Sequence, residues 1–537
     1  MSRLMNPTEA SSVPRGPLTF YVDARAGSDE NDGQSETTPF QTLDRVSEER
    51  YQPGDRILFR KGRTYHGNLI IHACGSASAP VLVSTYGSGA KPQIAAKGGA
   101  AVTIRAIYLT MEGLEITNPD GVYGIHIVAL QSGKNSGITV SDCYIHDVNR
   151  DETTGWGGYI GSGGIIARAD GEEPVWFQDL VLQNNVIRRT SRMGITISNS
   201  WGWRYYHENA SYIRNRFVDD EHGWYPNVGC QITGNTIDST GGDSILVQCG
   251  KDTRIERNTV YHANASTKEH AKIAMVAIWT ICTVNTVMQY NEVGYTKRPG
   301  ADGEAFDTDH AEVGCTIQYN YSHNNEGGFV LLCNGRPGTA KNATVRYNLS
   351  VNDGRHEDGA CIQFIGDVLE TNIYNNTFWL SAASRIMDVW RNRAACTWIA
   401  GNIFAAPSGM ELAYTARPDP KPGGSVTDTD FCKAVTGFVF ENNVFYQVPL
   451  PPVGGGVQAL RNREEDPLFS VREFTETDYT NRERMVEAFT PKHPLIGAPS
   501  IPDNGGRDIL GAEITADFYG CVGYFTQEYT HKEEADS

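Results

Sequence analysis

Between residues 96 and 448, short runs of alternating apolar and polar residues are separated by Gly, Asn, Asp and Ser. Residues 316–319 and 328–332 are two short β-rich runs of one repeat. Alternation with a period of two is typical of a strand that buries one face, and the 3.6-residue period of an amphipathic helix is absent from this stretch. The pattern therefore predicts many short strands joined by turns.

An internal repeat orders these strands: an Asn, then any residue, then an aliphatic or aromatic one. The repeated residues are Asn185, Asn215, Asn235, Asn258, Asn291, Asn320, Asn348, Asn376, Asn402 and Asn443, with spacings of 30, 20, 23, 33, 29, 28, 28, 26 and 41. Repeats of this length predict a right-handed parallel β-helix, an all-β solenoid in which each coil hydrogen-bonds to its neighbours. Asn at a fixed turn tolerates the left-handed conformation and passes side-chain hydrogen bonds along the stack, so we expect these residues to be structural.

The segments that flank this repeat have a different sequence pattern. Residues 18–95 are predicted to form an N-terminal cap and the first rungs, with a short helix after Thr38 that places Phe40, Leu43 and Val46 on one side. Such a cap covers the apolar end that a solenoid would otherwise expose.

The predicted organisation has four parts. They are a disordered leader at 1–17, the cap at 18–95, a catalytic β-helix at 96–448 with a Pro/Gly/Asp-rich insertion at 408–437, and a C-terminal extension at 449–537 that packs on the solenoid.

Charge restricts the partners. The chain has 64 acidic and 46 basic side chains, a net charge of −18. Such a field repels phosphate backbones and anionic membranes, so neither nucleic acid nor membrane is predicted as a partner. No run of 18 apolar residues occurs, and residues 1–17 lack the basic and apolar regions of an export signal, so secretion is expected only if a leader has been removed. The oligomeric state is not predicted.

Metal sites are not predicted either. The eleven Cys form no CxxC and no Cys/His pairing at zinc spacing. Asp29, Asn31 and Asp32 match a calcium loop only in part, so a plain turn is the prediction and calcium the alternative.

Aligning strand runs locates candidate chemistry. The runs that start at Ser244, Ala305, Phe329, Cys361 and Ile386 place Ile245, Phe306, Val330, Ile362 and Met387 inside the solenoid. The outward row is then Leu246, Asp307, Leu331, Gln363 and Asp388, and the next outward row is Gln248, Asp309, Cys333, Ile365 and Trp390.

Four carboxylates fall within eight residues, at Asp302, Glu304, Asp307 and Asp309. Two like charges on one strand face raise the pKa of one of them, and one neutral with one ionised carboxyl is what glycoside hydrolysis needs. A solvated acidic turn or a calcium site is the alternative. Asp is depleted in strands, which favours function at Asp307 and Asp309.

Other side chains are predicted to line a substrate groove. They are Glu304, His270, Lys272, Glu326, Gln363, Asp388, Trp279 and Trp390. Aromatic residues also gather in the long excursions, at Trp156, Trp201, Trp203, Tyr205, Tyr206, Trp224 and Tyr225. Sugar rings stack on such faces, and rigid aromatic loops also pack on one another, so both interpretations stay open.

The segments 20–33 and 54–59 resemble the start of many carbohydrate-active right-handed parallel β-helix proteins. More narrowly, Asp302-x4-Asp307-x-Asp309 followed by residues 316–325 resembles the active-site rung of glycoside hydrolase family 136, the lacto-N-biosidase-like enzymes. The resemblance implies a retaining glycoside hydrolase acting on a neutral oligosaccharide or glycoside. It implies Asp302 as acid/base and Asp309 as nucleophile. We expect Asp307 to hold or tune them; Asp307 exchanging roles with either partner stays an alternative, because the sequence does not give the carboxyl separation that distinguishes retaining from inverting geometry.

Two alternatives stay open. A polysaccharide lyase or uronate epimerase needs a cation to neutralise the substrate carboxylate, which Lys272, Arg298, Arg336, Arg355 or Arg391 would supply. A non-catalytic glycan-binding solenoid needs no chemistry and leaves the carboxylates unexplained.

Overall fold

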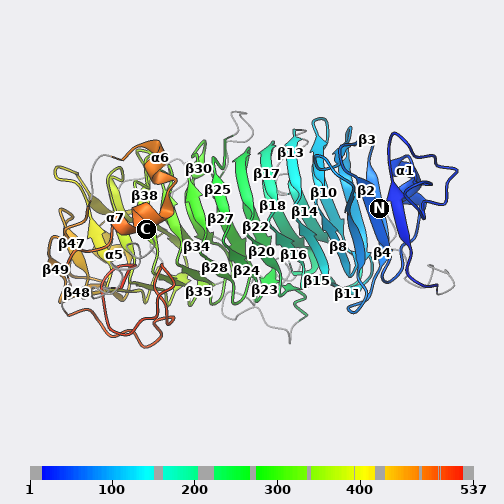
Figure 1. Ribbon diagram of the computed structural model, residues 1–537. Coiled ribbons are helices and arrows are strands. Elements are labelled where there is room, and N and C mark those ends of the chain that lie inside the picture. Colours follow the sequence, from blue (N-terminus) through cyan, green and yellow to red (C-terminus); the bar gives the residue numbers. More distant parts are fainter. Residues whose placement is uncertain are drawn as a thin grey trace. The chain divides into compact units, whose positions relative to one another are not determined.

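The computed structural model describes residues 15–149, 161–202, 223–265, 274–334, 340–391, 394–417, 430–470, 474–493, 495 and 497–523. The chain divides into two compact units, Met1–Cys315 with Arg336–Ala340 and Thr316–Gly335 with Lys341–Ser537. Parallel strands dominate each unit (Figure 1). Within the ranges given above, no helix has the length and apolarity needed to span a membrane.

The first unit consists of three long parallel sheets. The first runs β1 (Thr19–Val22), β2 (Arg56–Arg60), β5 (Val81–Tyr86), β8 (Leu109–Glu112), β12 (Ile138–Ser141), β16 (Val181–Gln183), β20 (Gln231–Thr233), β24 (Arg254–Glu256), β28 (Val287–Gln289). The second runs β4 (Leu69–Cys74), β7 (Ala100–Ile107), β10 (Tyr123–Val128), β14 (Gly163–Ala169), β18 (Met193–Asn199), β22 (Ile245–Gln248), β27 (Ile278–Ile281), β31 (Glu304–Thr308). The third runs β3 (Thr64–His66), β6 (Gln93–Ala95), β9 (Glu115–Asn118), β13 (Tyr144–Val148), β17 (Val186–Thr190), β21 (Thr236–Thr240), β25 (Thr259–Tyr261), β29 (Glu292–Gly294).

Two shorter sheets complete this unit. One contains β11 (Gly133–Ser136), β15 (Val175–Gln178), β19 (Asn227–Val228) and β23 (Gly250–Lys251). The other pairs β26 (Ala274–Met275) with β30 (Ala301–Asp302).

The second unit has the same plan. Its sheets run β32 (Thr316–Gln318), β36 (Thr344–Arg346), β40 (Asn372–Tyr374), β43 (Trp398–Ala400), β46 (Phe438–Glu441), β48 (Val457–Leu460); β34 (Gly328–Asn334), β38 (Ala360–Gly366), β42 (Arg385–Trp390), β45 (Ala413–Arg417); and β33 (Tyr321–His323), β37 (Leu349–Val351), β41 (Thr377–Trp379), β44 (Ile403–Ala405), β47 (Val444–Tyr446), β49 (Arg463–Glu464). A short pair joins β35 (Ala340–Lys341) to β39 (Val368–Leu369).

Successive strands of the chain visit the three sheets in turn, so that one coil of each unit stacks on the next. In the first unit, for example, β22, β24 and β25 lie in different sheets and β27 returns to pair with β22. The apolar alternates fill the interior, where Ile245, Ile278 and Phe306 have no exposed surface. The predicted fold class, a parallel β-helix, is confirmed.

The Asn repeat forms the predicted hydrogen-bonded stack. In the first unit each Asn from Asn185 through Asn235 and Asn258 binds the next, ending at Asn291, and all four are buried. In the second unit the same stack runs from Asn320 through Asn348, Asn376, Asn402 and Asn443 to Asn462.

One predicted member of the Asn stack is not among the described residues. Asn215 lies outside the described residues, and the backbone N–H of Asn185 donates directly to Asn235 Oδ1 at 2.9 Å. Asn462 takes a place in the stack that the sequence analysis did not assign.

The N-terminal helix is shorter than predicted. Helix α1 (Leu43–Glu48) begins after Thr42, whose hydroxyl accepts a hydrogen bond from Arg45 N. Phe40, which was expected on the helix, instead bridges to Val22. Arg15, grouped with the leader in the sequence analysis, binds Asp55 at 2.7 Å.

The acidic turn near this helix is tied by the chain itself. Asp29 accepts from the N–H groups of Gln41 and Thr42, both at 3.0 Å, and from the Thr42 hydroxyl at 2.7 Å. Asp32 accepts from Gln34 N and from the Thr38 hydroxyl. These contacts match the predicted turn.

The coils continue beyond the predicted end at 448. Strands β48 and β49 pair with β46 and β47, and β45 adds a strand within the predicted insertion. Helix α5 (Phe431–Ala434) follows in the insertion, whose residues 418–429 lie outside the described ranges. The extension carries α6 (Glu476–Tyr479) and α7 (Arg482–Ala488), and Tyr479 O accepts a hydrogen bond from Tyr321.

Candidate active site

The candidate site lies on β31, the last strand of its sheet in the first unit. Trp279 on β27 is in register with Asp307, and Thr280 with Thr308. Just past the strand, Asp309 N donates to Thr280 O at 2.9 Å. The sequence alignment passed directly from 244–248 to 305–309, so it missed that β27, with Trp279, lies between Leu246 and Asp307.

The backbone turns sharply where Asp302 enters the site. Asp302 pairs with Met275 and has a φ of 63°, and Gly303 follows with a φ of 93°. Gly303 N donates to Met275 O at 2.7 Å, which fixes this turn. Asp tolerates the left-handed region better than most residues, because its short polar side chain forms local hydrogen bonds. The turn joins β30 to β31 and holds Asp302 two residues before Glu304.

The carboxylates are not a solvated acidic turn. Glu304 has no exposed surface and Asp307 has only 4%. Asp302 is half-buried, and the Asp309 side chain is 14% exposed. Burying several carboxyls together is costly unless some of them are protonated or paired.

Burial and mutual repulsion act together on two of these groups. Burial, followed by the charges of Glu304 and Asp309, raises the pKa of Asp302 well above its ordinary value, and Arg298 opposes this rise. Burial and the charge of Asp309 likewise raise the pKa of Asp307 well above its ordinary value. The predicted perturbation of the Asp307–Asp309 pair is therefore present, and it keeps Asp302 and Asp307 protonated at higher pH than free carboxyls.

Asp309 has a different environment. Its Oδ1 lies 2.9 Å from Nδ1 of His310, whose side chain is 11% exposed. The pKa values of Asp302 and Asp307 are thus raised, and Asp309 has a basic neighbour.

A further buried carboxylate, Glu312, supports the turn that holds Asp309. Glu312 accepts from the hydroxyls of Thr280 and Thr283 at 2.5 and 2.6 Å and from Thr283 N at 2.9 Å. Burial raises the pKa of Glu312 to about 7, and the charge of Asp309 adds to the rise. Sequence reasoning missed both Glu312 and His310, although each lies within three residues of Asp309.

Two neighbouring side chains of the site each have a buried polar atom that is unsatisfied within the part of the chain that the structure describes. The atoms are Asp307 Oδ1 and Trp279 Nε1, on side chains that share one register position. Buried polar atoms are normally hydrogen-bonded, so such a pair at one place points to a ligand contact.

The remaining predicted site residues lie outside the described ranges or in the second unit. His270 and Lys272 lie outside the described residues, while Glu326, Gln363, Asp388 and Trp390 belong to the second unit. There the predicted rows are confirmed, because Val330, Ile362 and Met387 are in register, as are Leu331, Gln363 and Asp388.

Asp388 is fully engaged within the second unit. It is 1% exposed and accepts from Trp390 Nε1 at 2.5 Å and from the Thr415 hydroxyl at 2.6 Å. Arg417 lies 3.5 Å from the same carboxylate and stacks on the Trp390 ring at 4.8 Å. These contacts make Asp388 a support for Trp390.

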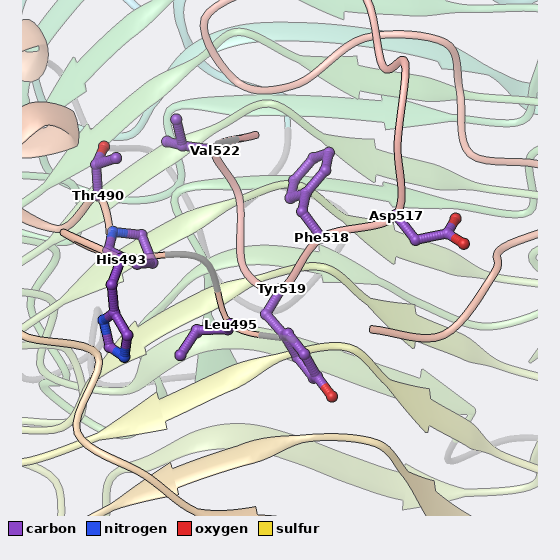
Figure 2. Close-up of a pocket in the computed structure, with 8 residues that line it drawn as sticks. Thr490, His493, Leu495, Asp517, Phe518, Tyr519 and Val522 are labelled. Atoms are coloured by element: carbon purple, nitrogen blue, oxygen red, sulfur yellow. The ribbon is translucent and has the colours of Figure 1, made fainter. Parts of the chain in front are cut away.

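A cavity in the C-terminal extension has a different character. It encloses about 60 Å³ and is lined mainly by apolar side chains, including Leu495, Phe518 and Tyr519 (Figure 2). His493 and Asp517 also reach its wall (Figure 2). No pair of carboxyls lines it, so it lacks the chemistry of the cluster on β31.

The coiled parallel sheets and the buried carboxylates on an outward strand row define the class: a parallel β-helix of the kind found in carbohydrate-active enzymes. The chain is 26% identical to lacto-N-biosidase from Bifidobacterium longum subsp. longum over a 508-residue alignment. That alignment covers 79% of this chain and 31% of the relative, so the chain spans about a third of the relative's length.

Solved structures agree. The native lacto-N-biosidase of glycoside hydrolase family 136 from Eubacterium ramulus superposes with a TM-score of 0.58 and 25% identity, covering 68% of this chain and 64% of that one. XylC with xylose superposes with a TM-score of 0.54 at 12% identity over 94% of this chain and 98% of its own, which shows the fold alone. No family model matches the chain. The resemblance to family 136 enzymes is thus confirmed as similarity in sequence and in structure.

Proposed function

We propose that the protein is a glycoside hydrolase that cleaves neutral oligosaccharides by a two-carboxylate mechanism that uses Asp302 and Asp309, which flank β31. The observation that carries the proposal is the contrast between Asp302, whose pKa is raised by burial and by its acidic neighbours, and Asp309, which has His310 at 2.9 Å. One protonated and one ionised carboxyl is the pair that glycosidic cleavage requires.

The first step uses both groups. Asp302 donates its proton to the glycosidic oxygen while an Asp309 oxygen attacks the anomeric carbon, so that the C–O bond to the leaving sugar breaks and a glycosyl ester forms. In the second step Asp302, now ionised, takes a proton from water, whose oxygen displaces Asp309 and regenerates the free carboxylate. The product retains the configuration of the substrate.

Asp307 and Trp279 act on the substrate beside this pair. A protonated Asp307 and the Trp279 N–H both offer hydrogen-bond donors on one outward row, suited to sugar hydroxyls. His310 Nδ1, 2.9 Å from Asp309 Oδ1, is the basic group beside the nucleophile. Glu312 holds Thr280, whose carbonyl binds the Asp309 backbone.

A uronate lyase is less well supported. Lys272 and Arg336 lie outside the described residues, and the charge of Arg298 acts on Asp302 together with the opposing charges of Glu304, Asp309 and Asp243. Within the described residues, carboxyls outnumber the basic groups that act on Asp302, and such a surplus of acidic groups disfavours an anionic uronate.

Product analysis tests the proposal. Parent protein, Asp309→Asn and the control Asp252→Asn, an exposed turn residue of the same unit, are incubated with neutral glycans that end in lacto-N-biose, other neutral glycosides and uronate polymers. We expect the parent and the control to release saturated sugars whose summed mass exceeds that of the substrate by one water. Asp309→Asn is expected to release none. An unsaturated product that absorbs in the ultraviolet, or full activity of Asp309→Asn, would overturn the proposal.

The stereochemistry tests the mechanism separately. Proton NMR during the first turnovers identifies the anomer released before mutarotation. A retained configuration supports Asp309 as nucleophile, whereas inversion would make Asp309 a base that activates water.

A further inference from the structure

Three aromatic side chains from separate segments of the first unit form one partly exposed cluster. Trp176 on β15 stacks on Tyr225 with a centroid distance of 5.9 Å and an angle of 21°. Trp201 meets the same Tyr225 edge-on at 6.0 Å and 87°. None of the three is fully buried, so rings at two orientations reach the surface together.

A single buried side chain assembles this aromatic cluster. Asn199, 1% exposed at the end of β18, accepts from Trp201 N at 2.8 Å and donates to Val175 O at 3.1 Å and to Tyr225 O at 2.8 Å. It therefore bonds to Trp201 and Tyr225 and to the residue before Trp176. The cluster is held in place before any ligand arrives, which lowers the entropic cost of binding.

The turn that carries Trp201 is also packed against the next coil. A Cβ at Gly202 would lie 2.4 Å from Cys249 Cβ, so only Gly permits this approach. Trp201 Nε1 donates to Gly171 O at 3.1 Å, which ties the ring to the preceding coil. Backbone and side-chain contacts thus fix Trp201 from both sides.

One member of the aromatic cluster, Trp201, lies at the same edge of one sheet as the carboxylate Asp309. Trp201 follows the end of β18 and Asp309 follows the end of β31, and the strand order between them is β18, β22, β27, β31. Figure 1 labels β18, β22 and β27 in this order. Three strand spacings of about 4.8 Å separate the two coils by about 14 Å along the sheet. A disaccharide is too short to touch both places, whereas a longer glycan lying across the strands reaches them.

Charge decides between the ligands that stack on aromatic rings. Nucleic-acid bases use such rings together with a basic groove. This chain carries a net charge of −18, which repels a phosphate backbone. Sugars stack their C–H faces on aromatic rings without needing a positive field.

We infer that Trp176, Trp201 and Tyr225 form a distal binding site for a neutral oligosaccharide whose scissile end lies at Asp302 and Asp309. The inference rests on the proposed function for the position of the scissile bond. It assigns the enzyme to glycans longer than a disaccharide, because only these gain from the distal contact.

The test compares substrates of two lengths. Trp176→Ala and Tyr225→Ala are assayed with a neutral disaccharide nitrophenyl glycoside and with a neutral hexasaccharide that ends in the same disaccharide. We expect kcat/KM to fall about fivefold or more for the hexasaccharide and to stay within about twofold for the glycoside. Trp176→Phe, which keeps an aromatic face, is expected to recover most of the hexasaccharide activity.

A matched control is Trp398→Ala, a half-buried Trp on β43 whose indole donates to Glu441 at 3.1 Å. It is expected to leave both substrates unaffected. Equal losses on both substrates in Trp176→Ala, or no loss on either, would overturn the distal site.

Binding separates this inference from the proposed function. Calorimetric titration of the hexasaccharide into Asp309→Asn and into the double variant with Trp176→Ala needs no turnover. Weaker binding in the double variant supports the distal site even if the parent proves inactive, and unchanged binding rejects it even if the parent is an active hydrolase.

Discussion

Trp279 and Asp307 lie directly opposite each other on β27 and β31, and each buries a polar atom that no described residue satisfies. The backbones of neighbouring paired strands lie about 5 Å apart, so the two side chains start from adjacent positions. The pair offers a hydrogen-bond donor and a carboxyl on one outward row of the solenoid, beside the two carboxyls proposed for catalysis.

The indole N–H of Trp279 is therefore expected to serve the substrate. Trp279→Phe keeps the ring and removes the N–H, so the free energy of unfolding should change by less than about 1 kcal/mol while kcat/KM falls roughly tenfold. Urea unfolding and steady-state kinetics measure the two effects. Trp398→Phe, which loses a bond to Glu441, serves as the control; a destabilised Trp279→Phe with full activity would contradict the assignment.

Arg298 should set the alkaline limit of activity. Its charge lowers the pKa of Asp302, against the larger effects of burial and of the neighbouring carboxylates, so Arg298→Gln raises that pKa further. The acid then stays protonated to higher pH, and the alkaline limb of the kcat/KM profile moves upward. Arg254→Gln, an exposed residue on β24, should leave the profile in place. A downward shift in Arg298→Gln would reject Asp302 as the acid.

Glu312 makes stability depend on pH. Burial raises its pKa from 4.5 to about 7 in the folded protein, so between those values the unfolded chain has lost the proton while the folded chain keeps it. The stability that Glu312 confers is complete below about pH 4.5 and is lost as pH rises to about 7, a change of about 3 kcal/mol.

Glu312→Gln removes this dependence. Urea midpoints of Glu312→Gln and of the parent are measured from pH 4 to 8. The midpoint of the variant should equal or exceed that of the parent at pH 8 and should be lower than that of the parent at pH 4. Glu256→Gln, a partly exposed carboxyl on β24, should track the parent throughout. Parallel curves for parent and Glu312→Gln would show that Glu312 titrates normally.

The Asn stack should contribute directly to stability. Asn258 donates to Ile232 O and Asn291 Oδ1 and accepts from Asn235, all within 3.0 Å. Asn258→Ala leaves buried backbone groups without partners and should destabilise the protein by about 2–4 kcal/mol in urea unfolding. Asn285→Gly, which removes an exposed amide and keeps the left-handed turn, should cost less than about 1 kcal/mol. Similar losses in both variants would show that the stack adds nothing.

The local sequence pattern was sufficient to predict the repeating coils. Alternation identifies which of two faces a strand buries, and the Asn spacing identifies where each coil turns, so Ile245 and Phe306 were placed inside and the Asn residues in one stack. The same pattern did not place every strand and every Asn correctly. Strand β27 escaped the alignment, and Asn215 was given a place in the stack between Asn185 and Asn235, which bond directly.

The sequence by itself determined the coiled parallel sheets, the Asn stack and the acidic run from Asp302 to Asp309, because a two-residue period and a fixed turn are properties of neighbouring residues. Tertiary structure alone decided which carboxyls are buried and that His310 lies beside Asp309. It also decided that Glu312 binds Thr280 and Thr283. The contacts of Asn199 with the segments that carry three aromatic rings were likewise visible only in the structure. Those relationships depend on which coil stacks on which and on how far each side chain is removed from water, and neither quantity is encoded in the spacing of residues along a strand.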